Sequence, residues 1–422
     1  MPSVVTIAVV GAGDRGTGHA GWALAYPERA KVVAVAEPRR ARRDRLVADH
    51  GLEAASAMDD WRVLAARGRI ADAVLICTLD REHLEPVGRV AQDVADRENH
   101  SGLLHRCHDQ PALVLRHTQA LKRIVDSGRL GEIVSVQHLE PVGFWHQAHS
   151  FVRGNWRRED EATSMLMAKS CHDLDWLQYV LGRPPVRVSS FGRLSHFRPE
   201  NKPGGAADRC LDCAVETSCP YSAKRDCGDQ LARGEHIWPL SVVIDEFTPQ
   251  ALDTALREGP YGRCVYACDN DVVDHQVVAM EFASGATGTF TMTAFTEQAD
   301  RQTRIFGTRA ELRGDGEHLR VYDFLTRSEE LIDLGTEGTM DAAGGHGGGD
   351  SGLMDAFVAA IATGDPGLVK SGPQESLTSH LTVLAAERAR HNNTVESIPL
   401  SDVDTVRAAS VADNGPETAQ ES

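Results

Sequence analysis

Lysine and positive charge are the scarcest features of this sequence. The 422 residues contain six lysines against 38 arginines, and the formal net charge is −17. A surface with such an excess of negative charge repels phosphate backbones and anionic lipid headgroups, so neither nucleic acid nor a membrane is expected as a partner. We attribute the low ratio of lysine to arginine to codon usage rather than to chemistry.

Long apolar runs and a leader sequence are also missing. No apolar run approaches the roughly 18 residues that a membrane-spanning helix needs. The N-terminal stretch MPSVVTIAVVGAG has neither the basic region nor the apolar region of a secretory signal, so we expect a cytoplasmic protein. In such a protein, nine cysteines favour metal binding or free thiols over a disulfide framework.

Strands and helices alternate over the first part of the chain. Residues 4–13, 31–38 and 71–78 are continuous β-branched apolar runs, typical of strands that are buried on both faces of a parallel sheet. Helical stretches separate these runs. The pattern predicts a doubly wound α/β domain over residues 1–130.

The pattern changes at Glu132, where longer alternating strands begin and where Ser284-Gly285 marks a hairpin turn. These strands predict an α+β domain with a large, mostly antiparallel sheet over residues 131–400. A loop insertion rich in Cys, Pro and Gly is expected at 197–236. The small polar residues of 401–422 predict a flexible tail.

A glycine-rich loop follows the first predicted strand and opens a helix. In this loop Gly11 permits the tight turn, Gly13 admits a pyrophosphate to the backbone, and Gly16 lets the helix pack on the strand. The helix N-terminus then faces the phosphates with its partial positive charge. The residues predicted to bind the cofactor here are Gly11, Gly13, Asp14, Arg15 and Gly16.

Glu37 ends the second predicted strand, 21 residues after Gly16. A carboxylate at this place binds the hydroxyls of the adenosine ribose and repels a 2′-phosphate, which favours NAD over NADP. Arg39 and Arg40 follow at once and could bind that phosphate, so NADP stays an alternative.

Four motifs, VVGAGDRG, VAVAEPR, ICTLDREHLEP and SGRLGEIVSVQHLEP, together resemble those of the Gfo/Idh/MocA oxidoreductases. The resemblance extends over residues 4–90 and 113–400. It implies a Rossmann domain beside an open-faced sheet domain, hydride transfer between NAD(P) and a sugar, inositol or related polyol, and a homo-oligomer built through the C-terminal sheet. It also implies that Thr78, Asp80 and His83 lie along the cofactor.

The segment between the two halves departs from the family. Family members carry a Glu-Lys-Pro strand here whose lysine reaches the nicotinamide and the substrate, but this chain has no lysine between Lys31 and Lys122. Residues 95–115 are also too few for the expected strand, crossover helix and strand, which need about 30 residues. We interpret 94–112 as a divergent or frameshifted replacement loop. The alternative is a metal site formed by His100, His105 and His108.

The catalytic prediction rests on the family's Asp-x-Gly-x-His motif, whose histidine corresponds to His172 while Ala168 and Ser170 replace the Asp and the Gly. Hydride transfer from an alcohol needs a base for the hydroxyl proton, and histidine suits that role. Lys169 lies three residues earlier, so a helix presents both side chains on one face. We predict that Lys169 holds the substrate oxygen or partly replaces the missing lysine. A buried structural histidine is the alternative.

Polar and aromatic residues gather in the segment 140–160, and a glycine loop at 344–350 could close over a substrate. Aromatic faces beside paired donors suit a sugar or polyol, whereas the alternative is a surface loop with unrelated aromatic residues. The predicted substrate contacts are His146, Arg153, Asn155, Trp156, His346 and Asp350.

Cys210, Cys213 and Cys219 stand close together in the predicted insertion. Short, loop-borne spacing suits tetrahedral structural zinc, because the thiolates must converge from a turn. We predict Cys268 as the fourth ligand, with Cys264 and Cys227 as alternatives. Two alternatives to zinc remain: free or disulfide-paired thiols, and an iron–sulfur cluster.

The sequence as a whole predicts an NAD(P)-dependent oxidoreductase of the Gfo/Idh/MocA type that acts on a sugar, inositol or related polyol, with activity impaired by the missing lysine. Two alternatives stay open. One is an enzyme that uses NAD to cleave glycosides, and the other is a non-catalytic nucleotide-binding remnant or sensor.

Overall fold

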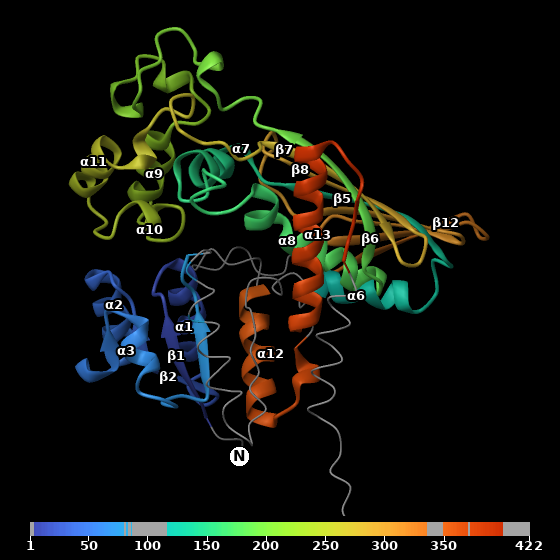
Figure 1. Cartoon of the computed structure of the whole chain (residues 1–422), viewed down its shortest axis with the longest axis horizontal. Helices are drawn as coiled ribbons and strands as arrows, with labels where there is room; N and C mark the ends of the chain where they lie inside the picture. The colour runs from blue at the N-terminus through green and yellow to red at the C-terminus, as the bar shows by residue number, and fades with distance from the viewer. Residues whose placement is uncertain are drawn as a thin grey trace, which may run out of the picture.

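The computed structural model describes residues 4–79, 82, 86, 116–335, 349–369 and 372–399, and their strands form two sheets (Figure 1). The predicted segment 94–112, Asp80, His83 and His346 lie outside the described residues. Among the described helices, none combines the length and the apolar character that crossing a membrane requires.

The first sheet has four parallel strands in the order β3-β2-β1-β4. Ile7, Ala8 and Val9 are fully buried, which confirms the prediction of strands covered on both faces. The strands are β1 (Val5–Val10), β2 (Ala30–Ala36), β3 (Ala57–Met58) and β4 (Ala73–Ile76), and the helices between them are α1 (Asp14–Ala25), α2 (Arg40–His50) and α3 (Trp61–Ala65).

Helix α12 (Gly349–Thr363) also packs against the first sheet, although it comes late in the chain (Figure 1). Its side chains Met354, Phe357 and Val358 join the hydrophobic core formed by β1, β2 and α1. The range 131–400 assigned to the second domain therefore contains one element that packs with the first domain.

The second sheet has nine strands in the order β12-β11-β10-β9-β5-β8-β7-β6-β13. Neighbouring strands are antiparallel except β5 and β8, which confirms the mostly antiparallel prediction. The turn at Ser284-Gly285 joins β7 to β8, and Gly285 has a φ of +85°. The strands are β5 (Ile133–Pro141), β6 (Pro185–Arg193), β7 (His275–Phe282), β8 (Thr287–Thr293), β9 (Gln302–Gly307), β10 (Ala310–Gly314), β11 (His318–Asp323), β12 (Ser328–Asp333) and β13 (Glu396–Ser397).

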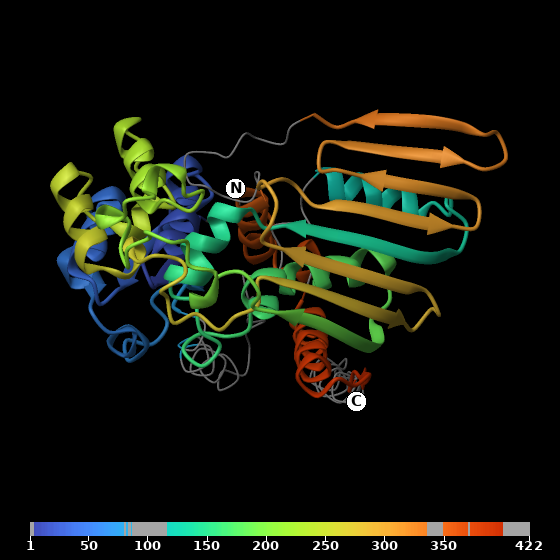
Figure 2. The same ribbon diagram turned by 90° about the horizontal axis from the view of Figure 1, so that it is seen from above.

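Three helices cover one face of the second sheet: α6 (Arg116–Asp126), α8 (Met165–Leu181) and α13 (Pro373–Asn392) (Figure 2). Phe290 of β8 and Leu177 of α8 lie in the core between them. The opposite face carries exposed apolar side chains. Phe191 is 67% exposed and Val277 is 38% exposed there.

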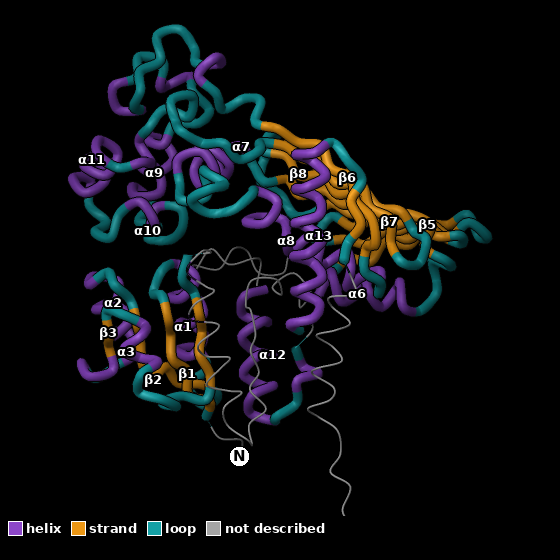
Figure 3. The backbone as a smooth tube through the Cα atoms, in the orientation of Figure 1, coloured by secondary structure: helices purple, strands orange, loops and turns teal. Residues whose placement is uncertain are grey.

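The Cys-rich insertion contains short helices and extends beyond the loop predicted at 197–236 (Figure 3). They are α9 (Ala223–Ala232), α10 (Leu240–Val243) and α11 (Pro249–Glu258). Ser222 and Thr248 cap α9 and α11 by accepting backbone N–H groups. A small core of its own, with Cys227, Leu240 and Leu256, holds these helices together.

Candidate functional site

The glycine loop has the shape that its sequence predicts. Gly11 has a φ of +91°, and a Cβ added there would lie 2.6 Å from the carbonyl oxygen of Cys77. A Cβ added at Gly16 would lie 1.9 Å from the carbonyl oxygen of Gly11. At Gly13 the nearest described atom to an added Cβ is Nη1 of Arg42, at 3.6 Å. As far as the described residues go, Gly13 therefore faces open space at the N-terminus of α1, where a pyrophosphate fits.

Glu37 is buried at the end of β2. Its Oε2 accepts the N–H of Ala12 at 2.7 Å, and its Oε1 accepts the N–H of Arg39 at 2.9 Å. A carboxylate offers about four acceptor positions, so two stay available for ribose hydroxyls. These bonds fix Glu37 beside the glycine loop.

The hydroxyl oxygen Oγ1 of Thr78 is buried and has no hydrogen-bond partner in the part of the chain that the structure describes. Thr78 follows Cys77, whose carbonyl lies next to Gly11. A buried hydroxyl without a partner is costly unless a ligand completes it. The glycine loop, Glu37 and Thr78 thus fit a dinucleotide.

Two side chains of the glycine loop contact segments that lie far away in the sequence. The hydroxyl of Ser241 donates to Oδ1 of Asp14 at 2.9 Å, and burial raises the pKa of Asp14. Nη1 of Arg15 lies 2.6 Å from Oδ2 of Asp350. Asp350, predicted to close over a substrate, is therefore placed at the cofactor loop.

Both predicted catalytic residues lie on α8, which Ser164 caps by accepting the N–H of Met167. Nζ of Lys169 lies 3.1 Å from Oε1 of Glu140 on β5. His172 is buried, and its Nδ1 lies 3.8 Å from the sulfur of Cys171. Glu140 is a partner of Lys169 that the sequence analysis missed, because it lies on a strand 29 residues away.

A buried network of charges extends from Lys169. Nε of Arg301 lies 2.7 Å from Oε2 of Glu140 and 3.0 Å from Oδ1 of Asp173, and Nε2 of His138 lies 3.2 Å from the same Oδ1. Burial opposes ionisation of Asp173, but Arg301 and His138 outweigh it and hold the pKa of Asp173 well below its usual range. Each carboxylate of the network faces a cation, Glu140 facing Lys169 and Arg301 and Asp173 facing Arg301, and these contacts fix Lys169.

The residues predicted to contact a substrate lie in different surroundings. The ring of His146 packs against Trp238 of the insertion, with 4.7 Å between the ring centroids. Trp156 stacks on Phe151 beside the core of the second domain. Asn155 is exposed. The substrate role of these three residues stays a prediction.

Arg153 is buried and bonds to the insertion. Its Nε donates to the carbonyl of Arg263 and its Nη2 to the carbonyl of Tyr221, both at 2.7 Å. Nη2 also lies 3.5 Å from the sulfur of Cys210. These contacts hold the insertion together and do not support the substrate role predicted for Arg153.

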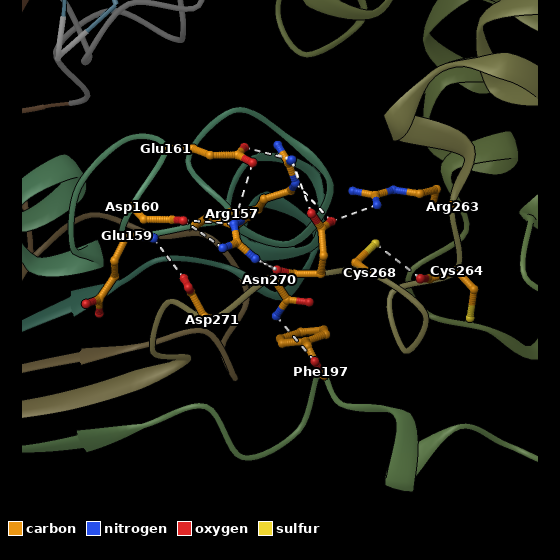
Figure 4. Close-up of polar contacts among 12 residues, drawn as sticks. Arg157, Glu159, Asp160, Glu161, Phe197, Arg263, Cys264, Cys268, Asn270 and Asp271 are labelled. Carbon is orange, nitrogen blue, oxygen red and sulfur yellow. Dashed lines mark hydrogen bonds and ion pairs between the residues drawn. The ribbon is translucent and has the colours of Figure 1, made fainter.

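The predicted zinc ligands do not converge. Among the described residues, no three of the sulfur atoms of Cys210, Cys213, Cys219 and Cys268 lie within 4.8 Å of one another. The thiol of Cys268 instead donates to the carbonyl of Cys264 (Figure 4). The described thiols thus lie farther apart than tetrahedral zinc ligands do, although Cys210 and Cys264 are near enough to affect the pKa of Cys219, and the zinc site stays a prediction.

One other group of potential ligands does come together in the described chain, formed by Glu159, Glu387 and His391. Nη2 of Arg390 lies 2.8 Å from Oε1 of Glu159 and 2.6 Å from Oε2 of Glu387. The guanidinium bridges the two carboxylates and offsets one of their two negative charges, so an ion-pair network already occupies this group.

His149 makes the stability of the protein sensitive to acid. Burial, with a contribution from the charge of Arg153, lowers the pKa of His149 to about 3. The unfolded chain binds this proton below about pH 6.5, whereas the folded protein does not until about pH 3. The contribution of neutral His149 to the free energy of unfolding is therefore fully present above pH 6.5, and it decreases as the pH drops toward 3.

We expect His149→Gln to flatten this loss of stability between pH 6.5 and 4, because glutamine takes up no proton. Urea unfolding followed by tryptophan fluorescence at several pH values measures the slope. His318→Gln, at a partly exposed histidine of β11, controls for the loss of one histidine. If the unfolding free energy of His149→Gln changes with pH as steeply as that of the wild type, His149 is not the source of the acid sensitivity.

Comparisons with known proteins point to one family. The Gfo/Idh/MocA model described as "Oxidoreductase family, C-terminal alpha/beta domain" matches residues 122–398. "Putative oxidoreductase YteT" of Bacillus subtilis (strain 168) is 23% identical over 248 residues, which are 56% of this chain and 55% of that protein. The match thus spans about half the length of this curated relative.

Solved structures share the fold. An oxidoreductase from Agrobacterium radiobacter in complex with NAD+, L-tartaric acid and magnesium has a TM-score of 0.64 and 14% identity, covering 94% of this chain and 99% of its own. The scyllo-inositol dehydrogenase from Lactobacillus casei with bound NAD(H) and scyllo-inositol has a TM-score of 0.60 and 15% identity, covering the same two shares. Identities this low demonstrate a common architecture only.

Proposed function

Since this chain belongs to the Gfo/Idh/MocA family of oxidoreductases, we propose that it transfers hydride between NAD(P) and a sugar, inositol or related polyol. One observation supports the cofactor above all: the open space beside Gly13, with the buried carboxylate of Glu37 fixed next to it. The family fold and the scyllo-inositol bound to the Lactobacillus casei enzyme support the substrate class.

His172 is the proposed base that takes the hydroxyl proton, and Lys169 is the proposed donor to the substrate oxygen as it becomes a carbonyl. The nicotinamide, when bound, supplies the hydride acceptor. Glu140 keeps the ammonium of Lys169 in place at 3.1 Å, and Arg301 in turn holds Glu140. Glu140 and Arg301 are therefore positioning residues in this proposal.

NAD is the proposed cofactor in preference to NADP. The carboxylate of Glu37 is buried at the place where an adenosine ribose binds, and a 2′-phosphate beside it would meet like charge. We also propose slow turnover, because the side chain of Lys169 is 14% exposed and already paired, so it replaces the missing lysine only in part.

We further propose a homo-oligomer that forms through the open face of the second sheet. Phe191 and Val277 are exposed there, and no element in the described ranges covers them. An exposed apolar sheet face of this kind favours association with a second copy. Arg187 and Glu281 form an ion pair between β6 and β7 on the same sheet.

The experiment combines nucleotide identification with a substrate panel. We expect mass spectrometry of the purified protein to detect NAD or NADP, and a panel of polyols to give slow, cofactor-dependent absorbance at 340 nm. Lys169→Met should lower kcat by about 10²–10³-fold, as the loss of a catalytic hydrogen-bond donor does. Its affinity for NAD should stay unchanged.

Lys202→Met, at a lysine of the insertion that pairs with Asp208, is the matched control and should keep wild-type turnover. Glycoside cleavage without net reduction of free cofactor would favour the glycosidase alternative. Bound nucleotide without any turnover would favour the sensor, and no affinity for either nucleotide would overturn the proposal.

A further inference from the structure

The Cys-rich insertion contacts the cofactor half of the protein. Besides the bond from Ser241 to Asp14, Nε of Arg42 donates to Oδ1 of Asp245 at 3.3 Å, and Nη2 of Arg45 donates to the carbonyl of Asp245 at 3.0 Å. Figure 1 shows the insertion, with α10, above the blue helices α1 and α2. The loop that follows α10 therefore lies against the edge of the cofactor site.

Arg42 is the residue that this contact places at the site. Its Nη1 is the nearest atom to an added Cβ at Gly13, at 3.6 Å, and its side chain is 15% exposed. Among the described residues, Asp245 is the one hydrogen-bond or ion-pair partner of Arg42, and the bond uses Nε. The Nη donors thus face the space beside Gly13, and a guanidinium binds phosphate oxygens through such paired donors.

The charges around Arg42 also suit an anion. Tyr261 of the insertion lies near Arg39 and Arg42, and burial raises the pKa of Tyr261 to about 12 although both arginines oppose this shift. The phenol is therefore neutral beside two cations. Two carboxylates also lie nearby: Asp245 pairs with Nε of Arg42, and Asp14 accepts from Ser241 and has a pKa that burial raises against the charges of Arg15 and Arg42.

We infer that Arg42 binds a phosphate group of the cofactor and that Asp245 of the insertion positions it. The inference rests on the proposed function and adds a specificity residue to it. Two phosphates have the required chemistry, the pyrophosphate common to NAD and NADP and the 2′-phosphate of NADP. The insertion thereby forms one wall of the cofactor site.

The test measures the affinity of the full chain for NAD+ and NADP+ by calorimetry. Arg42→Ala should weaken binding by at least about tenfold, as the loss of a charge-assisted hydrogen-bonding group does. An equal loss for both nucleotides identifies the pyrophosphate, and a loss confined to NADP+ identifies the 2′-phosphate. Arg69→Ala is the control, because Arg69 lies in the same domain, is 48% exposed and pairs with Asp72, away from the predicted cofactor residues.

Asp245→Asn should weaken binding less than Arg42→Ala does, and it should have no further effect in the Arg42→Ala background. A merely structural role of Asp245 would add to the loss instead. Affinities of Arg42→Ala within twofold of wild type for both nucleotides, with the melting temperature preserved, would overturn the inference. A wild-type chain that binds neither nucleotide would overturn the proposed function itself.

Discussion

Gly13→Val is expected to lower the affinity for NAD(P) by at least about 100-fold, a loss of about 2.7 kcal/mol, while the protein stays folded. Gly13 has a φ of −71°, which any residue adopts, and the nearest atom to an added Cβ is the flexible end of Arg42 at 3.6 Å. The fold therefore has room for valine. The same room is what a pyrophosphate needs, so the side chain and the cofactor exclude each other.

Two other glycines of α1 separate this effect from general damage. A Cβ added at Gly18 meets no atom of the described residues within 4 Å, so Gly18→Val should bind NAD(P) like wild type. A Cβ added at Gly16 would overlap the carbonyl oxygen of Gly11 at 1.9 Å, so Gly16→Val should unfold the first domain. Calorimetry and thermal melts measure both properties. A folded Gly13→Val protein with unchanged affinity would rule out a dinucleotide at this loop.

Restoring the family lysine is expected to raise turnover by about 10²–10³-fold, the usual effect of one catalytic hydrogen-bonding group. The repaired chain replaces residues 95–110 by a family-like strand and helix that contain Glu-Lys-Pro. The native chain has no lysine from 32 to 121, and the ammonium of Lys169 is already paired with Glu140. Reduction of NAD+ and NADP+ on a polyol panel compares the two chains.

His172→Ala in the repaired chain tests the catalytic site independently of the lysine. Loss of a positioned general base should lower kcat by about 10²–10⁴-fold. If the native chain is already as active as the repaired chain, another residue has the catalytic role of the missing lysine. A repaired chain that keeps its activity without His172 would remove that histidine from the proposed mechanism.

Local patterns were sufficient for most strands of the two sheets but not for β3, β12 and β13, which no predicted strand covers. The apolar runs at 4–13, 31–38 and 71–78 and the alternating strands after Glu132 became strands, because the side-chain period of a strand and its burial are both encoded in consecutive residues. The helices of the insertion were not predicted from such local patterns. Ser222, the cap of α9, lies in the stretch 197–236, whose Cys, Pro and Gly content resembles a loop, and Thr248, the cap of α11, lies beyond that stretch.

Thiol spacing shows the limit of such patterns at a site. Cys210, Cys213 and Cys219 are close in sequence, yet their sulfur atoms and that of Cys268 do not form a group of three within 4.8 Å. The direction of each thiol depends on the turn that carries it and on neighbours such as Arg153, which lies 3.5 Å from Cys210. Spacing along the chain contains neither piece of information.

Most strands, the glycine loop and the carboxylate after β2 could be predicted from the sequence, since each depends on near neighbours or on the steric freedom of a single glycine. Which distant side chains meet depends on the packing of the folded chain. The pairs Lys169 with Glu140, Arg15 with Asp350 and Arg42 with Asp245 join segments that lie 29, 335 and 203 residues apart. Such pairs form because packed helices and sheets bring their surfaces together. Hydrophobic burial drives that packing, and its free energy depends on the apolar area removed from water, not on the separation of residues along the chain.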